Sequence, residues 1–166
     1  TMEQLISTPL RVPEMIFGKM IPYFAIGMLD VTIALIVGHW MFGVPFRGSL
    51  LLMYGVTAIF IVGVLGFGLL ISIVAKNQLV ANQVAMVTTF LPAFLLSGFM
   101  YDISNMPPPI RLVTWIVPAR YYVSFLKGVF LKGVGLEILG FEAMMLAVFA
   151  TVILVLAHLR LKKKLF

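Results

Sequence analysis

The chain has 166 residues, of which 62% are hydrophobic and only 11% are charged. Its mean hydropathy is +1.13, whereas soluble domains average roughly a quarter charged residues. Together with uncharged runs that exceed the ~18 residues of a transmembrane helix, this composition excludes a water-soluble helical bundle. We therefore expect an all-α polytopic membrane protein, because spanning segments must satisfy their own backbone hydrogen bonds.

Charge and cysteine content narrow the function further. The net charge is +6 and there is no cysteine, which excludes disulfides, a thiol nucleophile and a thiolate metal site. In a membrane chain, clustered Lys and Arg more often mark the cytoplasmic side or contact anionic headgroups than bind nucleic acid. We therefore expect membrane lipids, and no nucleic acid, among the partners. The chain opens on Thr1 with no signal-peptide pattern, so we expect it to be part of a longer protein.

Four apolar runs are each long enough to cross a hydrocarbon core of ~30 Å at ~1.5 Å per residue. In chain order they are about residues 21–42, 50–75, 79–100 and 138–159. Asp30 interrupts the first run, and ionisable groups inside spans are candidates for function by default. A structural pair with a basic residue or hydroxyl on a neighbouring helix is the alternative for Asp30. Glu142 lies nearer a span end, where water access favours a structural role.

A fifth apolar run, residues 110–131, is not expected to cross. It contains Arg111, Arg120 and Lys127, and an Arg or Lys at the bilayer centre costs roughly 2.5–3.5 kcal/mol. Pro118 breaks its middle, because proline resists continuing a helix. We expect residues 107–131 to form a re-entrant hairpin that enters from the outer face and returns.

Four spans would place both chain ends on the same side of the membrane. The basic tail, residues 160–166, follows the last span directly, and Arg11 and Lys19 precede the first span. The positive-inside rule assigns this side to the cytoplasm. We therefore expect two regions, a cytoplasmic segment at 1–20 and a transmembrane domain at 21–166.

Three stretches resemble the C-terminal part of an ABC-type exporter permease of the type 2 class. MEQLISTPLRVPEMIFGK (residues 2–19) is similar to the family's cytoplasmic coupling segment, and LGFGLLISIVAKNQLVANQ (65–83) to a turn between two of its spans. The most specific match is LLSGFMYDISNMPPPIRLVTWIVPARYYVSFLKGVFLKG (95–133), where SG, MP, P, Y and KG recur at the family's spacings.

This resemblance implies a membrane subunit of an ATP-driven exporter of drugs, antibiotics, polysaccharides or lipids in the bacterial inner membrane. Two permease subunits, identical or not, would form the path, and a periplasmic adaptor is a further candidate partner. ATP and Mg would bind a separate ABC ATP-binding subunit, so this chain would be no enzyme and would hold no cofactor. The sequence has no G-x-x-x-x-G-K-[ST] phosphate loop, and its two distant histidines make no metal motif.

Three groups of candidate site residues follow. The resemblance implies a coupling helix that contacts the ATPase subunit, and the alternative is an ordinary juxtamembrane helix. The candidate residues of the coupling helix are Met2, Glu3, Gln4, Leu5, Ser7, Pro9 and Arg11. Candidates for the transport path are Asp30, Asn82 and Gln83. The hairpin would act as an outer gate, or alternatively as a passive plug; its candidates are Ser97, Gly98, Met106, Pro107, Pro118, Tyr121 and Lys127.

Two further expectations can be compared with the structure. Small residues let helices approach closely, and the spaced pairs Gly68–Ser72 and Ala34–Gly38 are candidates for such contacts. The rival function is an ion- or proton-coupled secondary transporter that uses Asp30 as its coupling site. A membrane-embedded enzyme would need clustered His, Asp, Ser or Cys residues near one membrane face, which the sequence does not offer.

Overall fold

The computed structural model describes residues 12–75 and 77–165, and in this part of the chain the regular structure is entirely helical. The long helices are α2 (Val12–Trp40), α3 (Leu50–Val74) and α8 (Leu136–Leu165). A further rod combines α4 (Gln78–Ala85), a π-helical turn (Met86–Phe90) and α5 (Leu91–Leu96). Two short helices follow it, α6 (Pro108–Val113) and α7 (Pro118–Lys127), the latter extended by a π-helical turn (Gly128–Lys132).

Four helical segments of the described chain are long and apolar enough to cross a membrane, which confirms the prediction of an all-α fold with four spans. They are Ile16–Trp40, Leu50–Val74, Gln78–Leu96 and Leu136–Leu161. The third ends four residues earlier than expected, because Gly98 adopts a left-handed φ of +83° that turns the chain. Helix α2 already begins at Val12, so residues 12–20 of the expected coupling segment are continuous with the first span.

Helices α3 and α8 form the centre of the bundle and run in the same direction. Gly63 faces Phe149 and Ala150 of α8, and Gly66 faces Ile153 and Leu154 one turn further along. A missing side chain lets backbones approach, which is how small residues act between membrane helices. Gly68 and Gly38 make no such approach within the described chain, because a Cβ at either would have nothing within 4 Å there.

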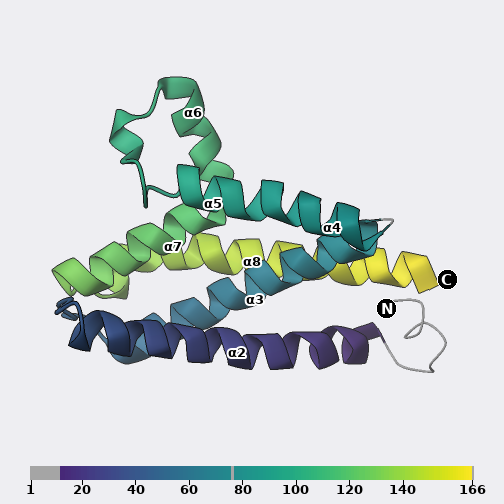
Figure 1. The fold of residues 1–166 in the computed structure, drawn as a ribbon, viewed down its shortest axis with the longest axis horizontal. Coiled ribbons are helices and arrows are strands. Elements are labelled where there is room, and N and C mark those ends of the chain that lie inside the picture. The colour runs from purple at the N-terminus through teal and green to yellow at the C-terminus, as the bar shows by residue number, and fades with distance from the viewer. Residues whose placement is uncertain (1–11, 76, 166) are drawn as a thin grey trace.

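The other two spans lie on opposite sides of this central pair. Figure 1 shows α2 along one side of α3 and α8 and the α4–α5 rod along the other. The first turn of α2 and the last turn of α8 lie at the same end of the bundle. The loop between α2 and α3 lies at the opposite end, together with the turn between α7 and α8. This arrangement agrees with an even number of spans.

The third span contains a π-helical turn (Met86–Phe90) that its sequence explains. Pro92 has no N–H, so it cannot donate a hydrogen bond to the carbonyl oxygen of Thr88, four residues earlier. The N–H of Leu91 donates to the carbonyl oxygen of Met86, five residues earlier, which is the π-helical pattern. The hydroxyls of Thr88 and Thr89 bond back to the carbonyls of the preceding turn. None of the 18-residue window of this span is fully buried within the described chain, although residues such as Ala81, Ala85 and Thr89 are half-buried. Most of the rod's surface therefore faces surroundings outside the described residues.

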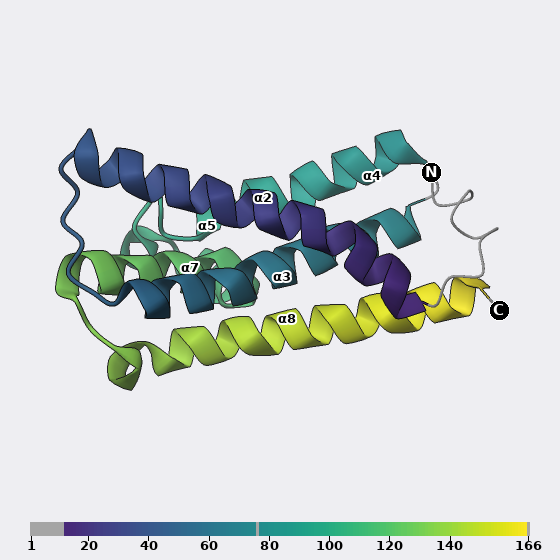
Figure 2. The same cartoon turned by 90° about the horizontal axis from the view of Figure 1, so that it is seen from below.

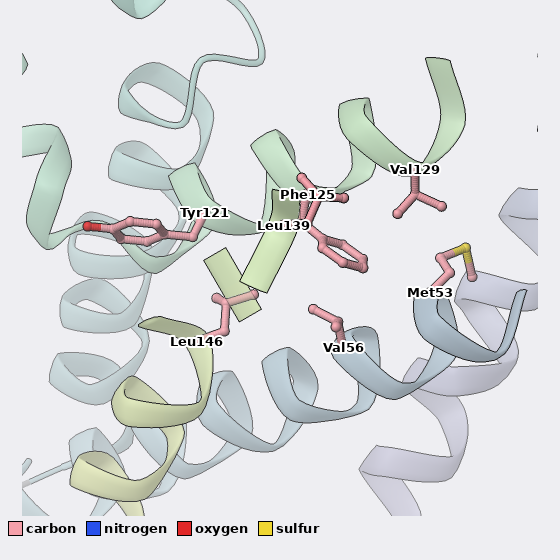
Figure 3. Packing of buried hydrophobic residues seen from close by; sticks show 7 residues of the cluster. All are labelled: Met53, Val56, Tyr121, Phe125, Val129, Leu139 and Leu146. Carbon is pink, nitrogen blue, oxygen red and sulfur yellow. The ribbon is translucent and has the colours of Figure 1, made fainter. Parts of the chain in front are cut away.

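Helix α7 packs into the end of the bundle opposite the chain termini. A hydrophobic cluster joins it to α3 and α8 (Figure 3), with Phe125 at its centre and completely buried. The cluster consists of Met53, Val56, Tyr121, Phe125, Val129, Leu139 and Leu146. A second cluster holds α2, α3 and α8 together at the terminal end, and it consists of Ile16, Met20, Leu69, Ile73, Ala157 and Leu161.

Candidate functional site

A hydrogen bond from Lys127 connects α7 to the end of the third span. The Nζ of Lys127, in the last turn of α7, donates a hydrogen bond of 2.7 Å to the carbonyl oxygen of Gly98. Gly98 is held in its left-handed turn beside the buried Ser97, whose Oγ accepts a 3.3 Å bond from the N–H of Phe99. Three of the predicted gate residues, Ser97, Gly98 and Lys127, are therefore brought together at the junction of α5 and α7.

A second set of contacts joins α7 to the turn that precedes it, within residues 107–131. Arg120 donates to the hydroxyl of the buried Thr114, and its guanidinium lies 4.4 Å from the ring centroid of Trp115. The hydroxyl of Tyr121 donates to the carbonyl oxygen of Trp115 at 2.7 Å. Within the described chain, a hydroxyl and an aromatic face therefore accommodate the charge of Arg120. Pro118 begins α7 and separates it from the turn that carries Thr114 and Trp115.

The run from Asp102 to Pro109 forms the approach to α6. Pro107 is extended, with ψ of 147°, but Pro108 and Pro109 already belong to α6, where the first turn tolerates proline. The N–H of Met106 donates to Ile103 at 3.2 Å. Asp102 accepts bonds from the N–H and hydroxyl of Ser104, both at 2.9 Å, and these bonds lower the pKa of the Asp102 carboxyl below its usual value.

Sequence reasoning missed the contacts that fasten α7 to α3. The hydroxyls of Thr57 and Tyr122 lie 3.0 Å apart, and Thr57 is completely buried. The ring of Tyr122 stacks on Phe60 with 4.2 Å between centroids. A hydroxyl residue within a long apolar span is a detectable signal, because buried polar groups need partners. The identity of the partner depends on the fold.

The path candidates do not converge within this chain. Asp30 is exposed near the middle of α2, while Asn82 and Gln83 are exposed on α4, across the central helices (Figure 1). The structural alternative for Asp30 finds no support in residues 12–75 and 77–165, which provide it with no ion pair or hydrogen bond. Glu142 is half-buried, and its buried Oε2 has no hydrogen-bond partner in the described chain.

The predicted coupling contacts, residues 2 to 11, lie outside the described residues. Among the residues that are described, no three His, Cys, Asp or Glu side chains gather as metal ligands would. The four apolar spans and the short helices that follow the third define a multi-pass helical membrane protein, with its polar contacts concentrated near the third span's end.

The chain belongs to the ABC-2 type transporter family, whose model matches residues 1–131. The resemblance drawn from the three sequence stretches is therefore confirmed. The chain is 42% identical, over 165 residues, to the "Probable multidrug ABC transporter permease YbhS" of Escherichia coli strain K12, which covers 99% of this chain and 44% of that protein. It is 35% identical, over 133 residues, to the "Probable multidrug ABC transporter permease YbhR" of the same strain, covering 78% of this chain and 35% of that one.

A more distant similarity reaches a eukaryotic protein. The "ABC transporter G family member 20" of Dictyostelium discoideum is 24% identical over 129 residues, which are 78% of this chain and 18% of that protein. No solved structure matches the chain. The chain spans less than half of the length of each of these curated relatives.

Proposed function

We propose that this chain is the membrane permease part of an ATP-driven exporter of amphiphilic or hydrophobic compounds. The observation that carries the proposal is the 42% identity to a probable multidrug ABC permease along 165 residues, together with the family match. ATP and Mg would bind a separate ABC ATP-binding subunit, and this chain would do no covalent chemistry. A second permease subunit, a copy or a homologue, would complete the path, and a periplasmic adaptor could receive the cargo.

Residues 1–20 would couple this permease to the ATPase subunit, with the contacts proposed for Met2 to Arg11. The geometry of α2 supports this assignment, because the helix begins at Val12 and continues without a break to Trp40. A displacement of the preceding segment would therefore be transmitted into the first span along one helix of 29 residues, in which Pro22 is a point where the helix can bend.

The segment from Pro107 to Leu131 would be the outer gate. Its support is mechanical, because α7 packs against α3 and α8 while Lys127 bonds to the end of the third span. A shift of that span would pull on Gly98 and hence on α7. The π-helical turn, a feature frequent at functional sites, gives the span a place to bend.

The location proposed is the bacterial inner membrane, with both ends of the chain in the cytoplasm. The exposed Arg160 and the partly exposed Lys19 lie at the end of the bundle where α2 begins and α8 stops (Figure 1). The sequence adds three lysines at 162–164. The positive-inside rule then favours the cytoplasm for this end.

Asp30 supports a second candidate, a proton- or ion-coupled transporter, because it is an exposed acid within a span. In the exporter, the same residue would face the path or the second permease. Efflux of a fluorescent amphiphilic dye from cells separates the two functions. We expect efflux to stop on depletion of ATP and to survive a proton ionophore. Efflux that the ionophore and Asp30→Asn abolish would establish the secondary transporter instead.

A further inference from the structure

The segment from Gly43 to Ser49 joins α2 to α3, and its start is fastened to the last turn of α2. Gly43 adopts a left-handed φ of +62°, a conformation that commonly ends helices. The N–H of Val44 donates to the carbonyl oxygen of Gly38 at 3.0 Å, and Nδ1 of His39 lies 3.1 Å from the carbonyl oxygen of Val44. The start of the segment therefore moves with α2.

The middle of the segment packs against the π-helical turn (Gly128–Lys132) that extends α7. A Cβ at Gly48 would lie 2.6 Å from Cγ1 of Val129 and 2.8 Å from its carbonyl oxygen, so there is no room for a side chain. The ring of Phe46 meets that of Phe130 edge-on, with 5.2 Å between the centroids. Val129 is completely buried and belongs to the hydrophobic cluster that holds α7 against α3 and α8. The segment is thus in backbone contact with a part of the chain that is itself firmly packed.

A second close approach lies where this turn ends. Gly133 has a left-handed φ of +64°, and a Cβ there would lie 2.9 Å from the carbonyl oxygen of Arg47. The N–H of Val134 donates to the carbonyl oxygen of Gly128 at 3.4 Å and closes the turn. Figure 2 shows the segment passing the end of α7 on its way to α3. One glycine on each side of the contact lets the two backbones touch, and a displacement of one therefore acts directly on the other.

The far end of the segment is fixed as well. Ser49 caps α3, since its Oγ accepts a 3.4 Å bond from the N–H of Leu52 and its carbonyl oxygen accepts a 3.1 Å bond from the N–H of Met53. The segment is therefore held by α2 at its start, by the π-helical turn in its middle and by α3 at its end. A short loop held at three points has little slack to absorb a shift of α2.

We propose that residues 43–49 act as a strap that transmits movement of α2 to the proposed outer gate. The strap acts on Val129, directly after α7, whereas the third span acts on Lys127 in the last turn of α7. The gate therefore receives two inputs, and one of them comes from the helix that continues the proposed coupling segment. This inference rests on the proposed gate, and it adds Phe46 and Gly48 to the gate as positioning residues.

Amide hydrogen exchange of the full-length protein in detergent tests the mechanical link without ATPase or cargo. Gly43→Val places a β-branched residue in the left-handed region and so loosens the strap at α2. We expect the N–H of Val134, across the contact, to exchange faster by about threefold or more, because exchange follows the stability of the local structure. Gly55→Val is the matched control, since a Cβ at Gly55 on α3 has nothing within 4 Å in the described structure. Faster exchange confined to the strap would overturn the proposal.

A cysteine pair tests the same link in export and covers the case in which Gly43→Val fails to fold. Phe46→Cys combined with Phe130→Cys, in a full-length protein free of other cysteines, removes the ring contact, and a short bismaleimide joins the two positions again. The protein is placed in vesicles with its copurified ATPase, and ethidium is the exported probe. We expect the unlinked pair to lower export by about threefold or more while ATP hydrolysis stays within about twofold of the wild type. Crosslinking should restore export, whereas Phe46→Cys alone, treated identically, should not recover.

The outcomes separate the strap from the proposed function. Absence of ATP-dependent export by the wild type would contradict the proposed function, and the exchange experiment would still decide the link between the strap and the turn. Unchanged export by the unlinked pair, or a loss that crosslinking does not reverse, would overturn the strap. A block that appears only on crosslinking would overturn it too, because the loop would then have to part from the turn during export.

Discussion

Replacing Gly63 by valine is expected to force apart the two central helices, α3 and α8. A Cβ at this position would lie 2.9 Å from Cδ1 of Phe149 and 3.3 Å from Cα of Ala150. The phenyl ring can rotate away, but the backbone atom of Ala150 can move only with α8 itself. The clash therefore acts on the spacing of the helices as well as on one side chain.

The expected loss is about 1–3 kcal/mol, the usual range for adding carbon atoms to a well-packed interior. Helix propensity acts in the other direction, because glycine is roughly 1 kcal/mol worse than alanine inside a helix. Gly68→Val provides the control for this term, since a Cβ at Gly68 has nothing within 4 Å in the described structure. The difference between the two variants isolates the cost of the close approach.

Titration of the purified protein with SDS in mixed micelles, followed by circular dichroism, measures both variants. We expect Gly63→Val to unfold at a lower SDS fraction than the wild type, and Gly68→Val to match or exceed the wild type. Equal midpoints for the two variants would refute the assignment of α3 and α8 as a closely packed pair.

Three further predictions concern the contacts around α7. Lys127→Met removes the bond to Gly98 and should speed amide exchange at residues 97–101, because the hydrogen bond of a charged group stabilises the local structure by roughly 1.5–3 kcal/mol. Lys132→Met, at the end of the π-helical turn that follows α7, should leave this exchange unchanged. Hydrogen bonds from Ser104 lower the pKa of the Asp102 carboxyl from its usual 3.8. The stability that these bonds give the folded state is therefore present above pH 3.8, and it is lost as the pH falls through the lower pKa that Asp102 has in the folded state. The N–H of Ser104 should exchange faster, relative to its intrinsic rate, as the pH falls through that range in the wild type, whereas Asp102→Asn should show no such acid step. Finally, a double-mutant cycle of Thr57→Val and Tyr122→Phe in SDS titrations should give a coupling of about 0.6–1.7 kcal/mol, the range for hydrogen bonds between membrane helices, and a value of zero would exclude the contact.

Run length and charge were sufficient to predict the four spans, because the hydrocarbon core demands helices of a minimum length. The same physics excluded residues 110–131 from crossing, and the structure breaks this run at Val117 and Pro118 into shorter helices. The turn at Gly98 was harder to predict, since a polar residue and a glycine within an apolar run are also common inside membrane helices.

The buried face of each span could not be predicted. In a soluble helix an apolar stripe marks the core, but in a bilayer the lipid-facing side is apolar as well. For this reason Gly68 was indistinguishable from Gly63 and Gly66 in sequence, although the described structure places only the latter two against α8. The same ambiguity affected the acids, since Asp30 is exposed whereas an oxygen of Glu142 is buried.

The partners of the charged residues in the 110–131 run could also be found only from the fold. Arg120 is satisfied by Thr114 and Trp115, six and five residues earlier, because the break at Pro118 folds α7 back toward that turn. Lys127 reaches Gly98 across 29 residues of sequence. The sequence could identify these cations as costly in a membrane, but not the groups that compensate for them.

The central claim is that the protein is the permease of an ATP-driven exporter. The most direct test is to purify the full-length protein from its native membrane and to identify its partners by mass spectrometry. We expect a stoichiometric ATPase with a phosphate loop, lost when residues 3–9 are scrambled and retained when residues 160–166 are scrambled instead. Absence of such an ATPase, together with transport that follows a proton or sodium gradient, would contradict the claim.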